Sequence, residues 1–375
     1  MELQSTVESC VMSNCTIPEA LVTKNATQTI CGIAPRAVTV DYLEVSVVLM
    51  TFTTFFVWSR LIFKRFYTTN GLRADDWLIF ATWLTCIPSA VINHVFLMKN
   101  GLGRDIWTLT PDTLKHFAIG FWAMELLYFF ETFALKLSMI GFYLTIFPGR
   151  TVRRLLLLTG LFDILFGVAF IFVPFDQCVP LTHFWTQFEG SQGRCIDFDA
   201  LAWAHGAISI AIDVWLITIP IYQLRHLQLS PWKKAGVSAM FFVGSFVTVI
   251  SIVRLVFLVQ MKGSINLTWD YFPVCLWSTV EVTVGILCTC MPTLRLILVR
   301  VTRRVGSTIR EKSPTWSSWS SFATRERSAK DQSCATQDSQ TRTSTVVAPK
   351  QDCDFELGTA GRGSPKDFSF GGNWI

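Results

Sequence analysis

The chain has little charge, and its cysteines and histidines lack the spacing of a metal site. Charged residues make up 16% of its 375 residues and hydrophobic residues 51%, whereas a soluble globular domain usually carries about 25% charged residues. The 11 cysteines contain no CxxC pair, and the five histidines lie apart from one another, so we expect no metal site. No Ser-His-Asp arrangement or phosphate-binding loop is recognisable. The sequence therefore favours a membrane protein that is not an enzyme, with no cofactor and no nucleic-acid partner.

Long apolar segments are abundant instead. A bilayer core about 30 Å thick requires roughly 20 apolar residues of helix. The segments that meet this condition are Tyr42–Phe63, Asp76–Met98, Phe117–Phe147, Leu155–Pro174, Leu201–Tyr222, Gly236–Gln260 and Phe272–Val299. Backbone polar groups in lipid must be bonded within each segment, which favours helices, and the segments lack the alternation of membrane strands. The sequence therefore predicts an all-α integral membrane protein, with a bundle of seven transmembrane helices over residues 42–301 in contact with the lipid bilayer.

The distribution of Lys and Arg predicts the orientation of this bundle, because short cytoplasmic loops are rich in basic residues. An outside N-terminus places ten basic residues in the predicted cytoplasmic loops: Arg60, Lys64, Arg65, Arg73, Arg150, Arg153, Arg154, Arg225, Lys233 and Lys234. The N-x-S/T sequons at Asn14, Asn25 and Asn266 all fall on the predicted outside, as glycosylation requires. We therefore expect a multi-pass plasma-membrane protein with an outside N-terminus and a cytoplasmic C-terminus.

The two ends of the chain differ in composition from the membrane part. Residues 302–375 are dominated by Ser, Thr, Gln, Gly and charged residues, and such a segment cannot bury enough apolar area to offset its ordering entropy. This predicts a disordered cytoplasmic tail. Residues 1–37 have no basic start and no apolar core of signal-peptide length, so the first long apolar segment must direct insertion.

Short motifs follow one another in a distinctive order along the membrane part. They are Asp75-Asp76-Trp77, Lys136-Leu137-Ser138, Cys178-x-Pro180, Gly193-Arg194-Cys195, Asp213 with Pro220-Ile221, Gly244, Arg254-Leu255, Trp277, Glu281 and Met291-Pro292. With this ordered set, the chain from Tyr42 to Val301 resembles the fungal seven-helix proteins with a rhodopsin-like domain, often described as CFEM-containing or appressorial-type G-protein-coupled receptor-like proteins. The resemblance implies a receptor-like function, with an unknown extracellular ligand and a heterotrimeric G protein as a candidate partner.

The same family resemblance has limits in this chain. Residues 1–41 are similar to the last third of a CFEM domain through Cys10, Cys15 and Cys31-Gly32, but the family's earlier cysteines and haem-liganding aspartate have no counterpart. We interpret the segment as a degenerate domain or a late gene start, and we expect no haem. The segment Phe272–Val299 contains no lysine, so a retinal Schiff base in the last helix is excluded.

Charged residues within the predicted spans are the main candidates for mechanism: Glu125, Glu131, Lys136, Asp163, Asp213, Arg254 and Glu281. In lipid such residues usually face the bundle interior or a water-filled cavity. At 1.5 Å per residue, Arg254 lies roughly 9 Å and Glu281 roughly 14 Å from the outer ends of their helices. This makes them our first-choice pair, with Glu125 or Glu131 as alternatives for Arg254, and Asp163 or Asp213 as candidates for Lys136. The network either lines a ligand cavity and acts as a switch, or only holds helices together at about 1–2 kcal/mol per contact.

The loop after the fourth predicted helix carries two further candidates. Cys178 and Cys195 flank this outside loop, where an oxidising environment permits a disulfide that contributes around 3 kcal/mol in the chain-entropy model. Trp185 lies between them and is our best candidate for a ligand contact, whereas most other tryptophans near the outer surface fit an interfacial belt.

Together these features favour a receptor-like protein that senses an extracellular cue. A small-solute transporter is an alternative, although the sequence shows no internal repeat or pair of interrupted helices. A non-signalling membrane scaffold is the other alternative.

Overall fold

A computed structural model of the chain describes residues 10–11, 14–38, 42–68, 71–147, 149–225, 231–262 and 264–312. The chain divides into two compact units, of which the first holds Met1–Leu298 and the second begins at Val299. The predicted tail from residue 313 onward lies outside the described residues.

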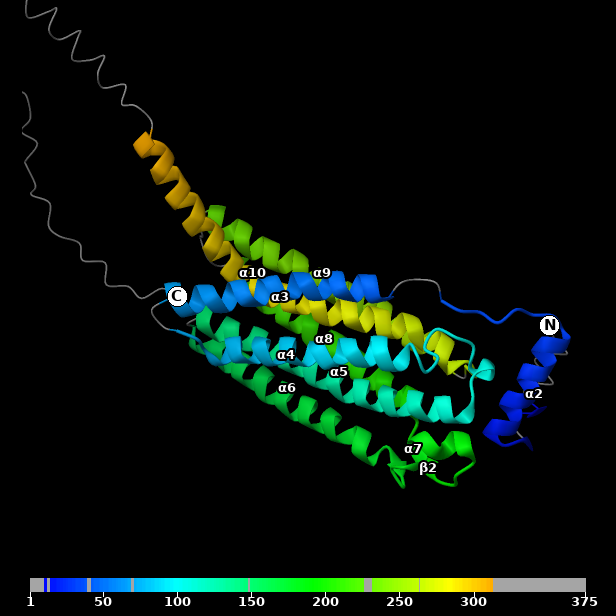
Figure 1. Ribbon diagram of the computed structural model, residues 1–375. Coiled ribbons are helices and arrows are strands. Elements are labelled where there is room, and N and C mark those ends of the chain that lie inside the picture. The colour runs from blue at the N-terminus through cyan, green and yellow to red at the C-terminus, as the bar shows by residue number, and fades with distance from the viewer. Residues whose placement is uncertain are drawn as a thin grey trace, which may run out of the picture. The chain divides into compact units, whose positions relative to one another are not determined.

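Seven helices in the described ranges are long and apolar enough to cross a membrane. They are α3 (Tyr42–Tyr67), α4 (Ala74–Val91) with its π-helical continuation Ile92–Leu97, α5 (Pro111–Ile146), α6 (Arg150–Asp176), α8 (Phe198–Arg225), α9 (Pro231–Gln260) and α10 (Leu267–Lys312). Within the first unit these helices run alongside one another (Figure 1). The predicted seven-helix membrane bundle is confirmed.

The helices extend beyond the apolar segments that predicted them. Arg60, Lys64 and Arg65 belong to α3 rather than to a loop, and α10 continues to Lys312 instead of ending near Val299. Residues 300–312 contain one glycine and no proline, so nothing in the local sequence stops the helix once it leaves the apolar stretch. The helix α10 thus continues past residue 302, where the sequence predicts the tail to begin.

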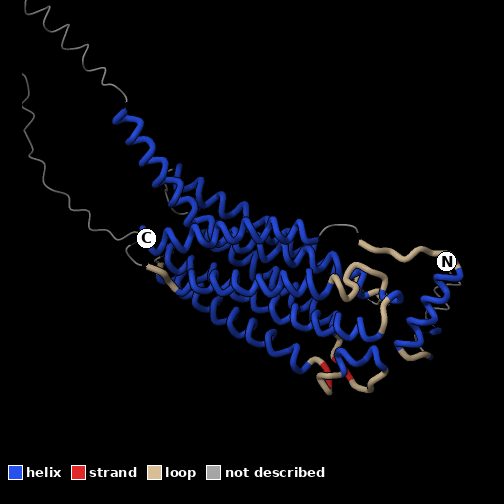
Figure 2. The backbone as a smooth tube through the Cα atoms, viewed as in Figure 1, coloured by secondary structure: helices blue, strands red, loops and turns tan. Residues whose placement is uncertain are grey.

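Smaller elements gather at one end of the bundle. They are α2 (Ile17–Ile30), α7 (His183–Thr186), β1 (Cys178–Val179) and β2 (Arg194–Cys195). The two strands pair antiparallel with Cys178 opposite Cys195, and a disulfide joins these cysteines. Figure 2 shows the short strands, in red, among the loops at this end, which we call the disulfide end.

The bundle has an apolar interior and an apolar outer surface. Val57, Ile79, Leu135, Val282 and Ile286 pack together in a buried cluster between helices α3, α4, α5 and α10. Outward-facing apolar side chains recur along α6 at Leu158, Leu165 and Phe172, which are 64%, 63% and 62% exposed. Their seven-residue spacing places them on one helix face, as a surface in contact with lipid tails requires.

A buried ion cluster ties three helices together at the opposite end of the bundle, which we call the Arg60 end. The Arg60 guanidinium donates from Nε to Asp76 at 2.8 Å and from Nη2 to Asp75 at 2.6 Å, and it also donates to the Thr289 carbonyl of α10. Lys64 bonds the same two carboxylates at 3.0 and 2.7 Å. Arg60 is 1% exposed and Asp76 0%, so charges from α3 and α4 neutralise one another out of contact with water.

We expect Arg60→Met to destabilise the protein strongly, because it leaves two buried carboxylates with Lys64 as their main cation. Removing one partner of a buried ion pair typically costs about 3–5 kcal/mol, and the remaining Lys64 contacts place the expected loss near ~3 kcal/mol. The melting temperature of purified protein and its membrane level measure this loss. Arg65→Met, an exposed position on the same helix, is the control. Equal stability of the two variants would contradict the role given to this cluster.

Candidate functional site

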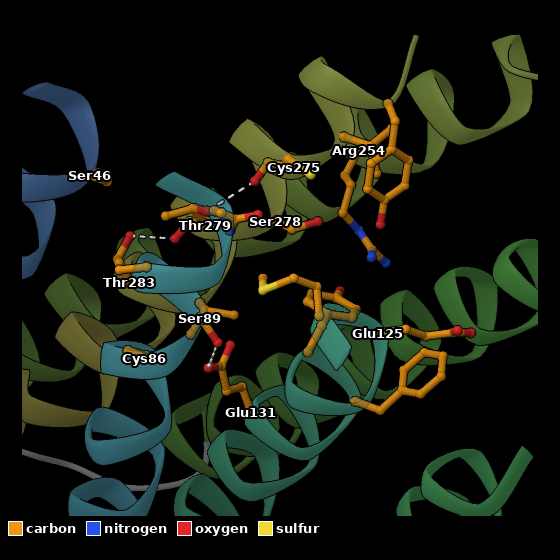
Figure 3. A pocket seen from close by; sticks show the side chains of 18 of the residues that line it. Ser46, Cys86, Ser89, Glu125, Glu131, Arg254, Cys275, Ser278, Thr279 and Thr283 are labelled. Atoms are coloured by element: carbon orange, nitrogen blue, oxygen red, sulfur yellow. Dashed lines mark hydrogen bonds between the residues drawn. The ribbon is translucent and has the colours of Figure 1, made fainter. Parts of the chain in front are cut away.

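Two cavities follow one another inward from the disulfide end. The wider has a volume of about 340 Å³ and lies under the disulfide loop, where Phe184, Gln187, Cys178 and Cys195 contribute to its wall. The deeper has a volume of about 80 Å³ and lies among α3, α4, α5, α8, α9 and α10. Figure 3 shows the labelled side chains around the deeper cavity. Its volume has room for several water molecules.

Aromatic rings form the boundary between the two cavities. Phe198 at the start of α8 and Tyr271 at the start of α10 line both of them. The Phe121 ring of α5 lies 4.3 Å from the Tyr271 ring and 5.3 Å from the Phe198 ring, within the range of favourable aromatic pairs.

A polar network around Arg254 borders the deeper cavity and joins three helices. Arg254 of α9 is 4% exposed, with its Nε 3.1 Å from Glu281 Oε2 of α10. Its guanidinium lies 4.4 Å from the centre of the Tyr128 ring of α5. Tyr128 donates to Glu281 Oε2 at 2.9 Å, and Ser251 donates to Glu281 Oε1 at 2.5 Å.

The contact between Arg254 and Glu281 is electrostatic rather than an aligned hydrogen bond. Within the described part of the chain, Arg254 Nε lies at ion-pair distance from the carboxylate but has no hydrogen-bond partner. The Tyr128 and Ser251 hydroxyls supply the hydrogen bonds that Glu281 needs. Of the acids considered for Arg254, the structure thus places Glu281 beside it, whereas Glu131 accepts a hydrogen bond from Ser89 at 2.7 Å.

A second buried ion pair continues this network along α5. Lys136 pairs with Asp213 of α8 and also donates to the Ser209 carbonyl at 3.1 Å. A cavity of about 60 Å³ is lined by Lys136, Asp213 and Glu281, so the two ion pairs face a common space. The other acid considered for Lys136, Asp163 of α6, is 1% exposed and lines neither the wider nor the deeper cavity.

Glu125 differs from the paired charges. It is 6% exposed and lines the deeper cavity. Neither carboxylate oxygen has a hydrogen-bond partner among the described residues. A buried polar group without a hydrogen-bond partner is costly, so an added molecule that donates to Glu125 would remove this cost.

Comparison with known proteins assigns the chain to a family. Residues 59–300 match the sequence profile of the fungal rhodopsin domain. The chain belongs to the fungal rhodopsin domain family. The match begins after the N-terminal segment, so the similarity of residues 1–41 to a CFEM domain remains a prediction.

Curated relatives of this fungal rhodopsin domain protein carry different descriptions. It is 32% identical over 200 residues to an Emericella nidulans SAT4 family membrane protein, covering 52% of this chain and half of that protein. It is 26% identical to Satratoxin biosynthesis SC1 cluster protein 4 of Stachybotrys chartarum, over 53% of this chain and 69% of that protein. It is 23% identical to Receptor GIN3 of Arthrobotrys oligospora, over 66% of this chain and 60% of that protein. No solved structure matches the chain.

The disulfide loop places Trp185 differently from our expectation. The half-buried Trp185 ring lies 6.3 Å from the Trp122 ring and packs with the cluster that contains Ile106 and Leu114. It lines neither the wider nor the deeper cavity, whereas its neighbour Phe184 lines the wider one. A ligand contact by Trp185 therefore stays a prediction without support from the cavity walls.

Asn266 is buried in the disulfide end and is not an accessible glycosylation acceptor in this fold. It is 7% exposed, its Nδ2 donates to Asp105 at 2.7 Å, and its Oδ1 accepts from the Ile106 amide at 2.8 Å. Asp105 also accepts from the Arg36 guanidinium at 2.9 Å. A glycan on this buried amide would have to displace the residues packed around it, whereas Asn14 and Asn25 are exposed.

Sequence reasoning missed several residues of the site. Tyr128 follows Glu125 by about one helical turn, and Ser251 precedes Arg254 by about one turn. Residues at this spacing lie on the same helix face, so the spacing was the signal that could have identified them. His205 is 3% exposed and its ring lies 4.5 Å from the Phe129 ring. A single histidine inside an apolar span was the only sign of it.

We expect the single substitutions Arg254→Glu and Glu281→Arg each to lower membrane expression, because each places like charges together in the interior. A buried charge left without its partner costs about 3–5 kcal/mol. The double swap restores opposite charges and should recover part of the lost expression, measured by surface labelling. Continued loss in the double variant would argue against direct pairing of the two positions.

Proposed function

We propose that this protein is a receptor for a small extracellular molecule that enters through the wider cavity. The observation that carries the proposal is the position of the Arg254–Glu281–Tyr128 network at the wall of the deeper cavity, where it joins α5, α9 and α10. A molecule that changes the contacts of Arg254 alters the balance between these three helices. A ligand shifts a conformational equilibrium only by its differential affinity for the two states, and this network supplies groups whose contacts can differ between states.

The name of one relative supports the same proposal. Receptor GIN3 of Arthrobotrys oligospora aligns over 66% of this chain. The proposed output is coupling to a heterotrimeric G protein through cytoplasmic loops and the tail, as the family resemblance implies.

A different description among the relatives favours a second candidate. Satratoxin biosynthesis SC1 cluster protein 4 aligns over 53% of this chain, and that name fits a membrane scaffold or solute transporter that accompanies a biosynthetic process. Such a protein would also use a cavity, but its function would not require a change at a G protein.

The proposed orientation places the disulfide end outside the plasma membrane, where Asn14 and Asn25 are exposed to glycosylation. We expect Asn14→Gln and Asn25→Gln each to remove one N-linked glycan. Each variant should therefore migrate faster than the wild type on a denaturing gel, and endoglycosidase treatment should abolish this difference. Asn266→Gln should leave the glycan pattern unchanged because that amide is buried. A wild-type protein insensitive to endoglycosidase would contradict the outside position of the N-terminus.

Coupling is tested by energy transfer between a donor on the C-terminal tail and an acceptor on each host Gα subunit in living cells. Receptor function predicts a change in transfer with at least one Gα when fractions of surface extract are added. Glu281→Gln keeps the side-chain shape but removes the charge that Arg254 faces. When this variant and the wild type are present at the cell surface in equal amounts, the variant should show a different energy transfer before any extract is added. Absence of transfer to every Gα, in protein shown to reach the surface, would favour the scaffold or transporter.

A further inference from the structure

The charges that line the two cavities are predominantly acidic. Asp197 and Asp199 are the charged residues in the wall of the wider cavity. The acidic and basic side chains in the wall of the deeper cavity, apart from tyrosines and cysteines, are Glu125, Glu131, His205 and Arg254. The one cation that stays charged there, Arg254, already lies against Glu281. The titratable groups that a ligand meets along this path without an ionic partner are therefore carboxyl groups rather than cations.

The acids along this path differ in how far the protein already uses them. Asp197 accepts from the Asp199 and Ala200 amides at 3.0 and 3.2 Å and so caps the start of α8. Glu131 accepts from Ser89 at 2.7 Å. Glu125, by contrast, has both carboxylate oxygens buried without a hydrogen-bond partner in the described part of the chain. A charged donor would give Glu125 the partner that the protein does not.

Aromatic rings share the wall of the deeper cavity with this carboxylate. Phe198 and Tyr271 line both cavities, and the Phe121 ring contacts both of these rings. The negative face of an aromatic ring attracts cations, and this attraction is stronger where water is excluded. The same rings offer apolar area to an uncharged hydrocarbon body.

We propose that the two cavities bind an amphipathic amine, whose protonated nitrogen bonds Glu125 and whose apolar body lies among Phe121, Phe198 and Tyr271. This deepens the proposed receptor function by naming its ligand class. The volume of about 340 Å³ in the wider cavity is near the lower limit of about 300–1,000 Å³ for small-molecule sites, which favours a body of one ring or a short chain. An anionic ligand is disfavoured because it would have to displace Glu281 from Arg254 and approach Glu125.

The test uses the full chain in lipid nanodiscs and two matched ligand series. These are phenethylamine, phenethyl alcohol and hydrocinnamate, and octylamine, octanol and octanoate. Binding is measured by the change in protein fluorescence and by the shift in melting temperature. The amine of at least one series should bind roughly tenfold or more tightly than its alcohol, as one charge-assisted hydrogen bond supplies, and the carboxylates should bind more weakly than the alcohols. Equal affinity of amine and alcohol in both series would overturn the proposal without any variant.

Two variants locate the site. Glu125→Gln should lower the amine affinity by roughly tenfold or more and make it equal to that of the alcohol. Asp163→Asn is the matched control, because Asp163 is also a buried acid but lines neither cavity, and it should bind the amine like the wild type. Melting temperatures without ligand show whether both variants are folded. A folded Glu125→Gln variant with wild-type amine affinity would overturn the assignment to Glu125.

The outcome of this binding test is separable from that of the coupling test. Amine preference that depends on Glu125, without any change at a Gα subunit, would support the ligand class and argue against signalling through G proteins. A response at a Gα subunit to surface extract, without amine preference in either series, would support the receptor and overturn the ligand class.

Discussion

The high cost of a charge in lipid is the constraint on which this structure depends. Inside the bundle, three groups of paired opposite charges lower this cost. Arg60 of α3 bonds Asp75 and Asp76 of α4, Lys136 of α5 pairs with Asp213 of α8, and Arg254 of α9 lies beside Glu281 of α10. Because each pair joins two helices, neutralising the charges also fixes which helices are neighbours and how they are rotated. Buried ion pairs contribute little net stability compared with apolar packing, but breaking one is costly, so these contacts chiefly specify one arrangement.

Glu125 differs from these paired charges because it has no partner among the described residues. Lys136 and Arg254 lie against acidic partners, whereas both oxygens of Glu125 lack a hydrogen-bond partner among the described residues. The loops at the disulfide end hold the wall above it in place. Cys178 is joined to Cys195, and Asn266 bonds both Asp105 and the Ile106 amide. A rigid outer wall, a carboxylate without a partner and a polar network that joins three helices together form an arrangement that can bind a small molecule and respond to it.

The sequence alone predicts the parts of this structure that depend on local properties. The lengths of the apolar segments predict seven membrane helices, because each helix must cross the bilayer core. The depth of Arg254 and of Glu281 in the membrane can be estimated by counting residues from the outer end of each helix. The two estimated depths are similar, which made these residues the first-choice pair. The partner of Lys136 could not be chosen between Asp163 and Asp213, because that choice depends on how α6 and α8 are rotated about their axes.

Other features depend on contacts between distant parts of the chain. Arg60 lies near the end of the predicted segment Tyr42–Phe63 and Lys64 directly after it, and both are counted with the cytoplasmic loop. The structure instead continues α3 through both residues, and they bond Asp75 and Asp76. The sequon at Asn266 is a three-residue pattern, and the partner that buries it, Asp105, lies 161 positions away. Phe121, Phe198 and Tyr271 come from three helices, so their meeting between two cavities has no sequence signature.

The most direct test of the central claim, that Glu125 and the aromatic rings beside it form a ligand site, is photolabelling with a diazirine derivative of phenethylamine followed by peptide mass spectrometry. The account predicts labels on the segments of α5, α8 and α10 that carry Phe121, Phe198 and Tyr271, and their loss in Glu125→Gln. Labels spread over the lipid-facing surface of α6 around Leu158 and Leu165, equal in the wild type and in Glu125→Gln, would contradict it.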